Sequence, residues 1–189
     1  MNLDKVFNFI KEKKGYEIPI AYRLVKKTMG NITTVRGNLD LTFRSIESLG
    51  NITTIGGNLI LHQTSIESLE NITTIGGNLE SFKTPVKSLG NLTTVGGKAD
   101  LAKTDITSLG NLTTVGGELD LYKTPVKSLG NLKTVGGNLN LAFTPIESLG
   151  DLTYVGGNLY LRETPISKKY TEREIRQMVN VKGKINYGI

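Results

Sequence analysis

The chain contains one histidine, His62, and no cysteine, so few of its side chains are of the types on which catalysis or metal binding usually depends. His62 lies beside Ile60 and Gln63, with no second nitrogen or sulfur ligand nearby, which argues against a transition-metal site. A hydrolytic triad would need a serine and a carboxylate beside this histidine, but the serines recur at one fixed phase of a repeat, as structural residues do. We therefore predict no catalytic residue, no metal and no cofactor, and a protein that is not an enzyme.

An acidic column is the second pattern that invites a chemical interpretation. It consists of Glu80, Asp100 and Asp120. Neighbouring strands lie about 4.8 Å apart, so these carboxylates would stack as like charges unless another group compensates them. Three residues further on, the sequence repeats a lysine, at Lys83, Lys103 and Lys123. Neutralisation by these lysines is the leading interpretation, and a bound cation or a basic segment of a partner is the alternative.

Glycine pairs recur once in six of the seven units of the repeat, as at Gly116 and Gly117. A phosphate-binding loop would continue into a Lys-Ser or Lys-Thr pair and a helix, whereas a strand pattern follows here. The sequence therefore predicts no phosphate site, and we interpret the glycines as turn residues.

These residues are positioned by a repeat of twenty residues that covers 31–167. A unit this short cannot enclose a core alone, so successive units must stack and share one, which predicts a solenoid. The seven units begin at Asn31, Asn51, Asn71, Asn91, Asn111, Asn131 and Asp151. With 189 residues, of which 38% are hydrophobic, the chain is long enough for one domain with a continuous core.

Six positions are apolar in the repeat units, except for Ser81 in the third unit, and are predicted to face inward. In the fifth unit they are Leu112, Val115, Leu119, Leu121, Val126 and Leu129. The two-residue spacing of Leu119 and Leu121 predicts a strand near 118–122, while the three-residue spacing of Leu112 and Val115 favours a tight turn or a short helical turn. Recurring threonines and serines between the apolar positions are predicted to bond the backbone at the corners.

The pattern Leu119-x-Leu121-x-x-Thr124-x-Val126 resembles the core of the leucine-rich repeat, Leu-x-Leu-x-x-Asn-x-Leu, with threonine in the asparagine position. The run Leu-Thr-x-Val-x-Gly-x-Leu is also similar to repeats of receptor L domains and of related proteins from bacteria and their viruses. The resemblance covers about residues 31–167. It implies a leucine-rich-repeat-like right-handed coil, mainly β, with a parallel β-sheet on one face that serves for binding.

A solenoid exposes its core at both ends unless other segments cover it. Within residues 1–30, an amphipathic helix is predicted by the spacing of Leu3, Val6, Phe7 and Ile10. Within residues 168–189, Thr171 and Glu174 form a capping-box pattern that opens a second helix. This helix would present Ile175, Met178 and Val179. An α-helical cap is therefore expected at each end.

The last residues copy the strand phase of the repeat. The pattern Val181-x-Gly183-x-Ile185 matches Val155-x-Gly157-x-Leu159 at a separation of 26 rather than 20 residues. We predict a closing strand, with the second helix inserted before it. Both sheet edges would then be occupied or shielded, so we expect a monomer.

The net charge of +6 is placed unevenly along the chain. Residues 1–30 and 166–189 are basic, whereas the repeat between them is nearly neutral. A protein that follows a phosphate backbone usually spreads Lys and Arg along its body, so this distribution disfavours nucleic-acid binding. The sequence has no long apolar run and its first residues are densely charged, which predicts neither a membrane span nor a signal peptide and so a cytoplasmic protein.

Three columns vary most between the units and are predicted to project from the sheet. They begin at Asp40, Thr42 and Phe43. Because aromatic side chains dominate the buried centres of protein interfaces, we predict that these columns form a partner-binding face. Its predicted residues are Asp40, Phe43, His62, Phe82, Asp100, Asp120, Tyr122, Phe143, Tyr160 and Arg162.

The predicted function is a non-catalytic protein–protein interaction module that binds a macromolecular partner on this face. Because the resemblance extends to proteins of bacteria and their viruses, blocking a host protein is one expected role. Ice or another crystalline surface is an alternative ligand, through outward threonine columns that begin at Thr33 and Thr34. Nucleic acid at the basic ends is a second alternative, and a carbohydrate stacked on the face aromatics a third.

Overall fold

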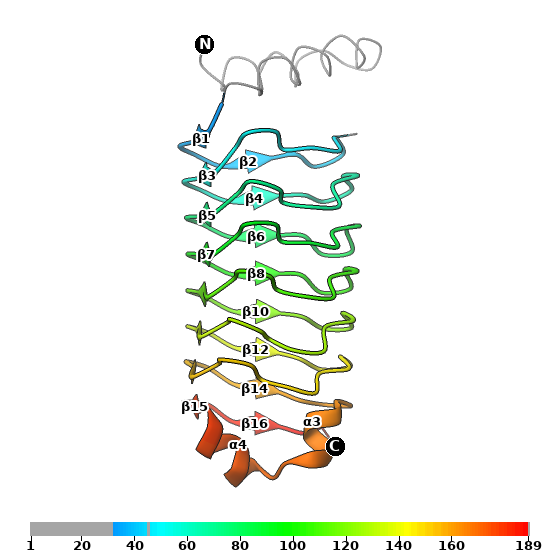
Figure 1. The fold of residues 1–189 in the computed structure, drawn as a ribbon, viewed down its shortest axis with the longest axis vertical. Helices are drawn as coiled ribbons and strands as arrows, with labels where there is room; N and C mark the ends of the chain where they lie inside the picture. The colour runs from blue at the N-terminus through cyan, green and yellow to red at the C-terminus, as the bar shows by residue number, and fades with distance from the viewer. Residues whose placement is uncertain (1–31, 45, 189) are drawn as a thin grey trace.

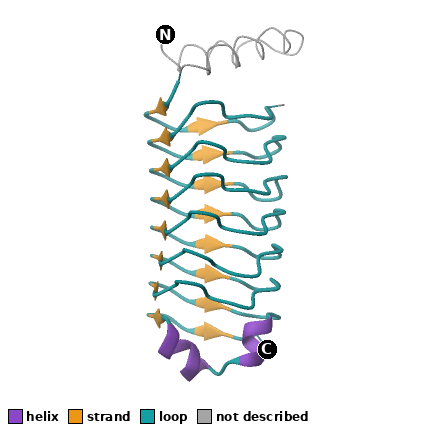
Figure 2. Ribbon diagram, in the orientation of Figure 1, coloured by secondary structure: helices purple, strands orange, loops and turns teal. Residues whose placement is uncertain are grey.

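The computed structural model describes residues 32–44 and 46–188, and shows a parallel-strand β-solenoid with a repeat of about twenty residues (Figure 1). Each coil contributes two short strands, which build two eight-stranded parallel sheets along the axis (Figure 2). The first sheet contains β1 (Thr34–Val35), β3 (Thr54–Ile55), β5 (Thr74–Ile75), β7 (Thr94–Val95), β9 (Thr114–Val115), β11 (Thr134–Val135), β13 (Tyr154–Val155) and β15 (Asn180–Val181). The second contains β2 (Leu39–Asp40), β4 (Leu59–Ile60), β6 (Leu79–Glu80), β8 (Ala99–Asp100), β10 (Leu119–Asp120), β12 (Leu139–Asn140), β14 (Leu159–Tyr160) and β16 (Ile185–Asn186).

The second sheet contains the strand that the sequence predicted. In the fifth unit this strand is β10, and Leu119 pairs with Leu139 of the next coil. The backbone N–H groups of Leu119 and Leu121 donate to carbonyls of that coil at 2.9 Å. Because the offset is twenty residues at each repeat junction, equivalent side chains form straight columns along the sheet.

The first sheet differs from the prediction of a tight or helical turn around Leu112 and Val115. Here Thr114–Val115 forms β9, and the N–H of Gly116 donates to the carbonyl of Val95 at 2.8 Å. These hydrogen bonds join neighbouring coils and not residues of one coil. A strand of two residues is also too short to show alternating apolar and polar residues, so the sequence pattern does not predict it.

The core lies inside the coils and forms one continuous cluster along the stack. All six positions predicted to face inward in the fifth unit have no exposed surface. Each such leucine or valine contributes roughly 1.5–3 kcal/mol by burial, and neighbouring coils share the contact surface. A single coil has no interior, which is why stacking stabilises the fold.

The glycine pairs are needed for close stacking of the coils and not for a turn. Neither Gly116 nor Gly117 has a positive φ. A Cβ on Gly116 would collide with the carbonyl oxygen of Gly96 in the preceding coil, and one on Gly136 would collide with that of Gly116. Only glycine allows the backbone of one coil to approach the next so closely.

The hydroxyl columns stabilise the corners, as predicted, although each threonine bonds its own coil. Thr124 is buried and its Oγ1 donates to the carbonyl of Leu121 at 2.8 Å. Ser128 Oγ accepts the N–H of Gly130 at 3.1 Å, in the turn before the next strand. Each corner is therefore closed locally, which satisfies polar groups beside the core.

Two helices, α3 (Pro165–Lys169) and α4 (Glu172–Met178), follow the last repeat. The predicted capping box opens α4, where the N–H of Thr171 donates to Glu174 Oε2 at 2.8 Å. The helix buries Ile175 and Val179, but Met178 is 46% exposed, so its predicted place in the core is wrong. Helix α3 could not be predicted from the sequence, because its residues still follow the repeat pattern as far as Ile166.

The closing strand is confirmed and extends both sheets. Val181 pairs with Val155 and Ile185 with Leu159, at the predicted separation of 26 residues. Arg176 of α4 donates to the carbonyls of Val181 and Gly183 at 2.7 and 2.9 Å, so this helix is bonded to the edge of the last strand pair. The predicted N-terminal helix lies outside the described residues.

Candidate binding face

The three variable columns lie on the second sheet and in the turn that follows it. The first column consists of strand residues such as Asp120 of β10. The second and third columns consist of turn residues such as Tyr122 and Lys123. The third column has a left-handed backbone throughout, with φ between 55° and 60°. Its members are Phe43, Gln63, Lys83, Lys103, Lys123, Phe143 and Glu163. This conformation is uncommon for residues other than glycine, and here it aims each side chain away from the core.

Cations and aromatic rings alternate along this face. Lys83 and Lys103 place their Nζ atoms 5.3 and 5.4 Å from the ring centre of Phe82. Lys123 Nζ lies 5.3 Å from the ring centre of Tyr122 and 5.5 Å from that of Phe143. All these distances are within the range in which a cation is attracted to the face of a ring. We call this set the cation–aromatic row, with members Phe82, Lys83, Lys103, Tyr122, Lys123, Phe143 and Arg162.

The row is continuous because large and small residues alternate in the second column. Ala102 and Ala142 are buried between the larger side chains of the coils on either side. Tyr122 meets Phe143 edge to face, with ring centres 5.5 Å apart and planes at 80°. Phe82 and Phe143 still keep 36% and 37% of their surface exposed, so a partner could contact both rings.

Two of the predicted face aromatics lie outside this row. Phe43 is 74% exposed and makes none of the ring contacts found among the described residues. Tyr160 is half-buried, and its hydroxyl accepts a hydrogen bond from Asn158 Nδ2 at 3.2 Å. The structure therefore brings together Phe82, Tyr122, Phe143 and Arg162 of the predicted face, and not the other two rings.

The carboxylates of the acidic column stabilise the turn that follows each strand. Asp120 Oδ1 accepts the backbone N–H of Tyr122 at 2.9 Å, and Asp100 Oδ1 accepts that of Ala102 at 3.2 Å. Asp40, in the first coil, makes the same bond to the N–H of Thr42 at 2.9 Å. These aspartates thus have a structural role, which the sequence analysis did not assign to them.

The predicted neutralisation of the acidic column by Lys83, Lys103 and Lys123 is wrong. Glu80 is 3.4 Å from His62 Nε2, and Asp100 is 4.0 Å from Lys98 Nζ. In the part of the chain that the structure describes, no ion pair joins the three predicted lysines to these carboxylates; they lie against the rings instead. The left-handed backbone aims the lysines along the turn, away from the strand positions that carry the acids.

Lys98 is a basic residue beside the acidic column whose role was not predicted from the sequence. Its Nζ lies 3.2 Å from Glu118 Oε1. Desolvation lowers the pKa of Lys98, but the bond to Glu118 and the fields of the three nearby carboxylates outweigh it and raise that pKa overall. Burial also raises the pKa of Asp120; the N–H of Tyr122 opposes this, and the charge of Asp100 adds to it.

An asparagine ladder runs beside the face and was also missed. Asn58 Oδ1 accepts the backbone N–H of Asn78 at 2.8 Å, and Asn78 Oδ1 accepts that of Lys98 at 2.9 Å. Lys98 and Glu118 interrupt the ladder at the two positions where the column has no asparagine. The signal in the sequence is the recurrence of asparagine at positions 38, 58, 78, 138 and 158.

The two outward threonine columns begin at Thr33 and Thr34. In the first of them the hydroxyl groups do not form a free lattice. Thr73 Oγ1 donates to the carbonyl of Thr53, and Thr113 Oγ1 to that of Thr93, both at 3.1 Å. These hydroxyl protons are therefore used between coils. The second column, which begins at Thr34, lies on the first sheet, away from the cation–aromatic row.

Comparisons with protein-family models, curated proteins and solved structures found no match for this chain. Its similarity to known repeats therefore rests on the residues and the fold described above. Among the described residues, no helix combines the length and the apolar character needed to cross a membrane.

Proposed function

We propose that this protein is a non-catalytic protein–protein interaction module that binds a macromolecular partner on the second sheet. The observation that supports this is the cation–aromatic row, which joins five coils, from Phe82 to Arg162. Aromatic rings and arginine are the side chains most often found at the energetic centres of interfaces, and the row contains three rings and Arg162. Here a framework of constant residues holds them, while the face itself varies from coil to coil.

The charge of the row favours a partner with acidic groups. Lys83, Lys103 and Lys123 are exposed, and among the described residues none of them is neutralised by a carboxylate. The acidic column beside them is less accessible and has partners of its own in His62 and Lys98. A protein surface that places carboxylates over the lysines and apolar groups over Phe82 and Phe143 fits this arrangement. Blocking a host protein is one role that such a module would serve.

We also propose that the repeat is leucine-rich-repeat-like, in a right-handed coil, and that α3 and α4 cap its C-terminal end. The threonine in the asparagine position, Thr124, supports the first point because it bonds the backbone at the corner. The bonds from Arg176 to Val181 and Gly183 support the second, because they occupy acceptors at a sheet edge. Because this sheet edge is occupied, we expect a monomer, which would appear as one species of 20.6 kDa in sedimentation.

Affinity capture from a lysate of the producing organism or its host tests the function. The variant Phe82→Ser, Tyr122→Ser, Phe143→Ser removes the rings and leaves every inward position unchanged. We expect the wild type to recover a protein that this variant loses. The matched control is Tyr154→Thr on the first sheet, which restores the repeat residue and should retain the partner. Equal recovery by all three proteins would refute the binding face.

A further inference from the structure

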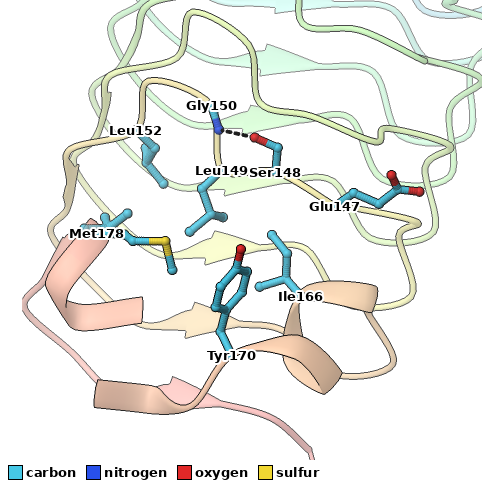
Figure 3. A pocket seen from close by; sticks show the side chains of 9 residues that line it. Glu147, Ser148, Leu149, Gly150, Leu152, Ile166, Tyr170 and Met178 are labelled. Atoms are coloured by element: carbon cyan, nitrogen blue, oxygen red, sulfur yellow. Dashed lines mark hydrogen bonds between the residues drawn. The ribbon is translucent and has the colours of Figure 1, made fainter. Parts of the chain in front are cut away.

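A pocket of about 290 Å³ lies between the last coil and the two helices (Figure 3). This volume is near the lower end of the range for ligand pockets in proteins. Its walls are polar along residues 147–150 of the coil and apolar elsewhere. The apolar side chains come from both parts: Leu149 and Leu152 from the coil, Ile166 from α3, Tyr170 between the helices, and Met178 and Val179 at the end of α4. Figure 3 shows the side chains of Tyr170 and Met178 below the two leucines.

The pocket occupies the place where another coil would continue the stack. In the preceding coil Leu129 and Leu132 have no exposed surface, and Leu149 and Leu152 recur at the same phase in the last coil. These last two retain 7% and 3% exposure, because no further leucine pair follows them. The pocket thus has the position that the segment from Leu129 to Leu132, and its counterparts in the other coils, has in the stack.

The backbone beside the pocket offers the hydrogen-bonding groups that such a segment uses. Where residues 127–130 meet 147–151, the N–H groups of Glu147 and Ser148 donate to Lys127, that of Asp151 to Gly130, and that of Leu129 to Ser148. The same four bonds join residues 67–70 to 87–91, whereas the junctions 47–50 with 67–71, 87–90 with 107–111 and 107–110 with 127–131 do not have them, so two of the five described junctions use these groups. Within residues 32–44 and 46–188, the corresponding groups of the last coil, Glu147 O, Leu149 N and Gly150 O, make no such bonds to a following segment.

We propose that this pocket binds an extended peptide segment of a partner protein that carries two apolar side chains, at positions i and i+3. The segment would add to the edge at residues 147–150 and place its apolar side chains under Leu149 and Leu152. A second copy of this chain fits poorly as the source, because its own leucine pairs are buried from the first coil onward, with Leu49 and Ile52 at zero exposure. This site is separate from the cation–aromatic row and does not depend on it.

The chain supplies its own probe for the test. A fluorescein-labelled peptide with the sequence of residues 124–133, Thr-Pro-Val-Lys-Ser-Leu-Gly-Asn-Leu-Lys, is titrated with the full-length protein and followed by fluorescence anisotropy. We expect saturable binding, and no binding of a control peptide in which both leucines are serine. Met178→Trp, which fills the pocket from its exposed rim, should weaken binding on the order of tenfold. Met178→Ala, which leaves the pocket open, should retain it.

A second readout reports on the backbone groups. Binding should slow hydrogen exchange at the Leu149 amide. The Phe82→Ser, Tyr122→Ser, Phe143→Ser variant should bind the probe as the wild type does, and this result would separate the pocket from the proposed binding face. The proposal is wrong if the wild type does not bind the probe, or if Met178→Trp binds it equally well. Dimerisation that Met178→Trp abolishes would overturn the assignment to a partner protein and make the second copy the occupant.

Discussion

The ammonium group of Lys103 lies 5.4 Å from the ring centre of Phe82, in the preceding coil, and 5.8 Å from that of Tyr122 in the next. One lysine therefore links three coils without an ion pair to a carboxylate. The left-handed backbone of Lys103 makes this possible, because it turns the side chain toward the space above the buried Ala102.

Replacing this lysine should weaken the stack only modestly. For Lys103→Met we expect a loss of about 0.5–1 kcal/mol in the free energy of unfolding, as for exposed cation–ring contacts. Urea denaturation measures it, and Lys127→Met, on a lysine that makes no ring contact among the described residues, is the control. A loss no larger than that of the control would mean that the rings do not hold the lysine in solution.

The asparagine ladder should contribute more per residue than the row. Asn78→Ala removes the acceptor of the Lys98 N–H and should cost about 1–2 kcal/mol, because that half-buried donor is left unpaired. Glu118→Ala, in the same column but without a bond to the backbone, should cost less than about 0.5 kcal/mol. Thermal denaturation of both variants tests the difference; equal losses would count against the ladder.

Glu70 occupies a left-handed position, φ 49°, which is glycine in most other coils. Glu70→Gly should therefore stabilise the protein by about 0.5–1 kcal/mol, although it loses the exposed bond from Ser48. Gly130→Ala is the reverse experiment, since its φ is 54° and a Cβ there would meet nothing within 4 Å. It should destabilise by about 1 kcal/mol through backbone strain alone. A stabilising Gly130→Ala would contradict this account.

Asp120 should make stability depend on pH. Burial raises its pKa above the ordinary value of 3.8, so the folded state holds the proton more tightly than the unfolded chain does. The free energy of unfolding should then fall as pH rises through this raised pKa. Asp120→Asn keeps the acceptor for Tyr122, as Asn140 does for Ala142. The variant should be more stable than the wild type at pH 7, and this advantage should disappear below pH 3.8.

Asp40 provides the control with the opposite sign. A hydrogen bond from the Thr42 hydroxyl lowers its pKa, so its charged form stabilises the folded state. Asp40→Asn should therefore lose stability at pH 7, with a difference from wild type that shrinks as pH falls through the lowered pKa. Thermal denaturation at pH 7 and pH 3 measures both variants, and the same sign for both would contradict the assignment.

The sequence by itself determined the solenoid, its period and its inward residues. The chain supplies its own replicates, so positions such as Leu119 and Val126 stay apolar while their neighbours change. The closing strand at Val181 and Ile185 was predictable for the same reason, because it copies the repeat's phase. The resemblance to leucine-rich repeats predicted one sheet, and the second sheet was missed because its two-residue strands have no period of their own.

Only the tertiary structure decided which variable residues meet. Lys103 contacts rings and not Asp100, although the lysines and the acidic residues recur at the same period. The reason is the left-handed backbone after each strand, which points the side chains of the third column away from the strand residues. The role of Lys98, the close approach at Gly116 and the pocket beside Leu149 likewise depend on contacts between coils. Residues twenty positions apart lie side by side in the stack, and no local pattern reports the distance or the angle at which they pack.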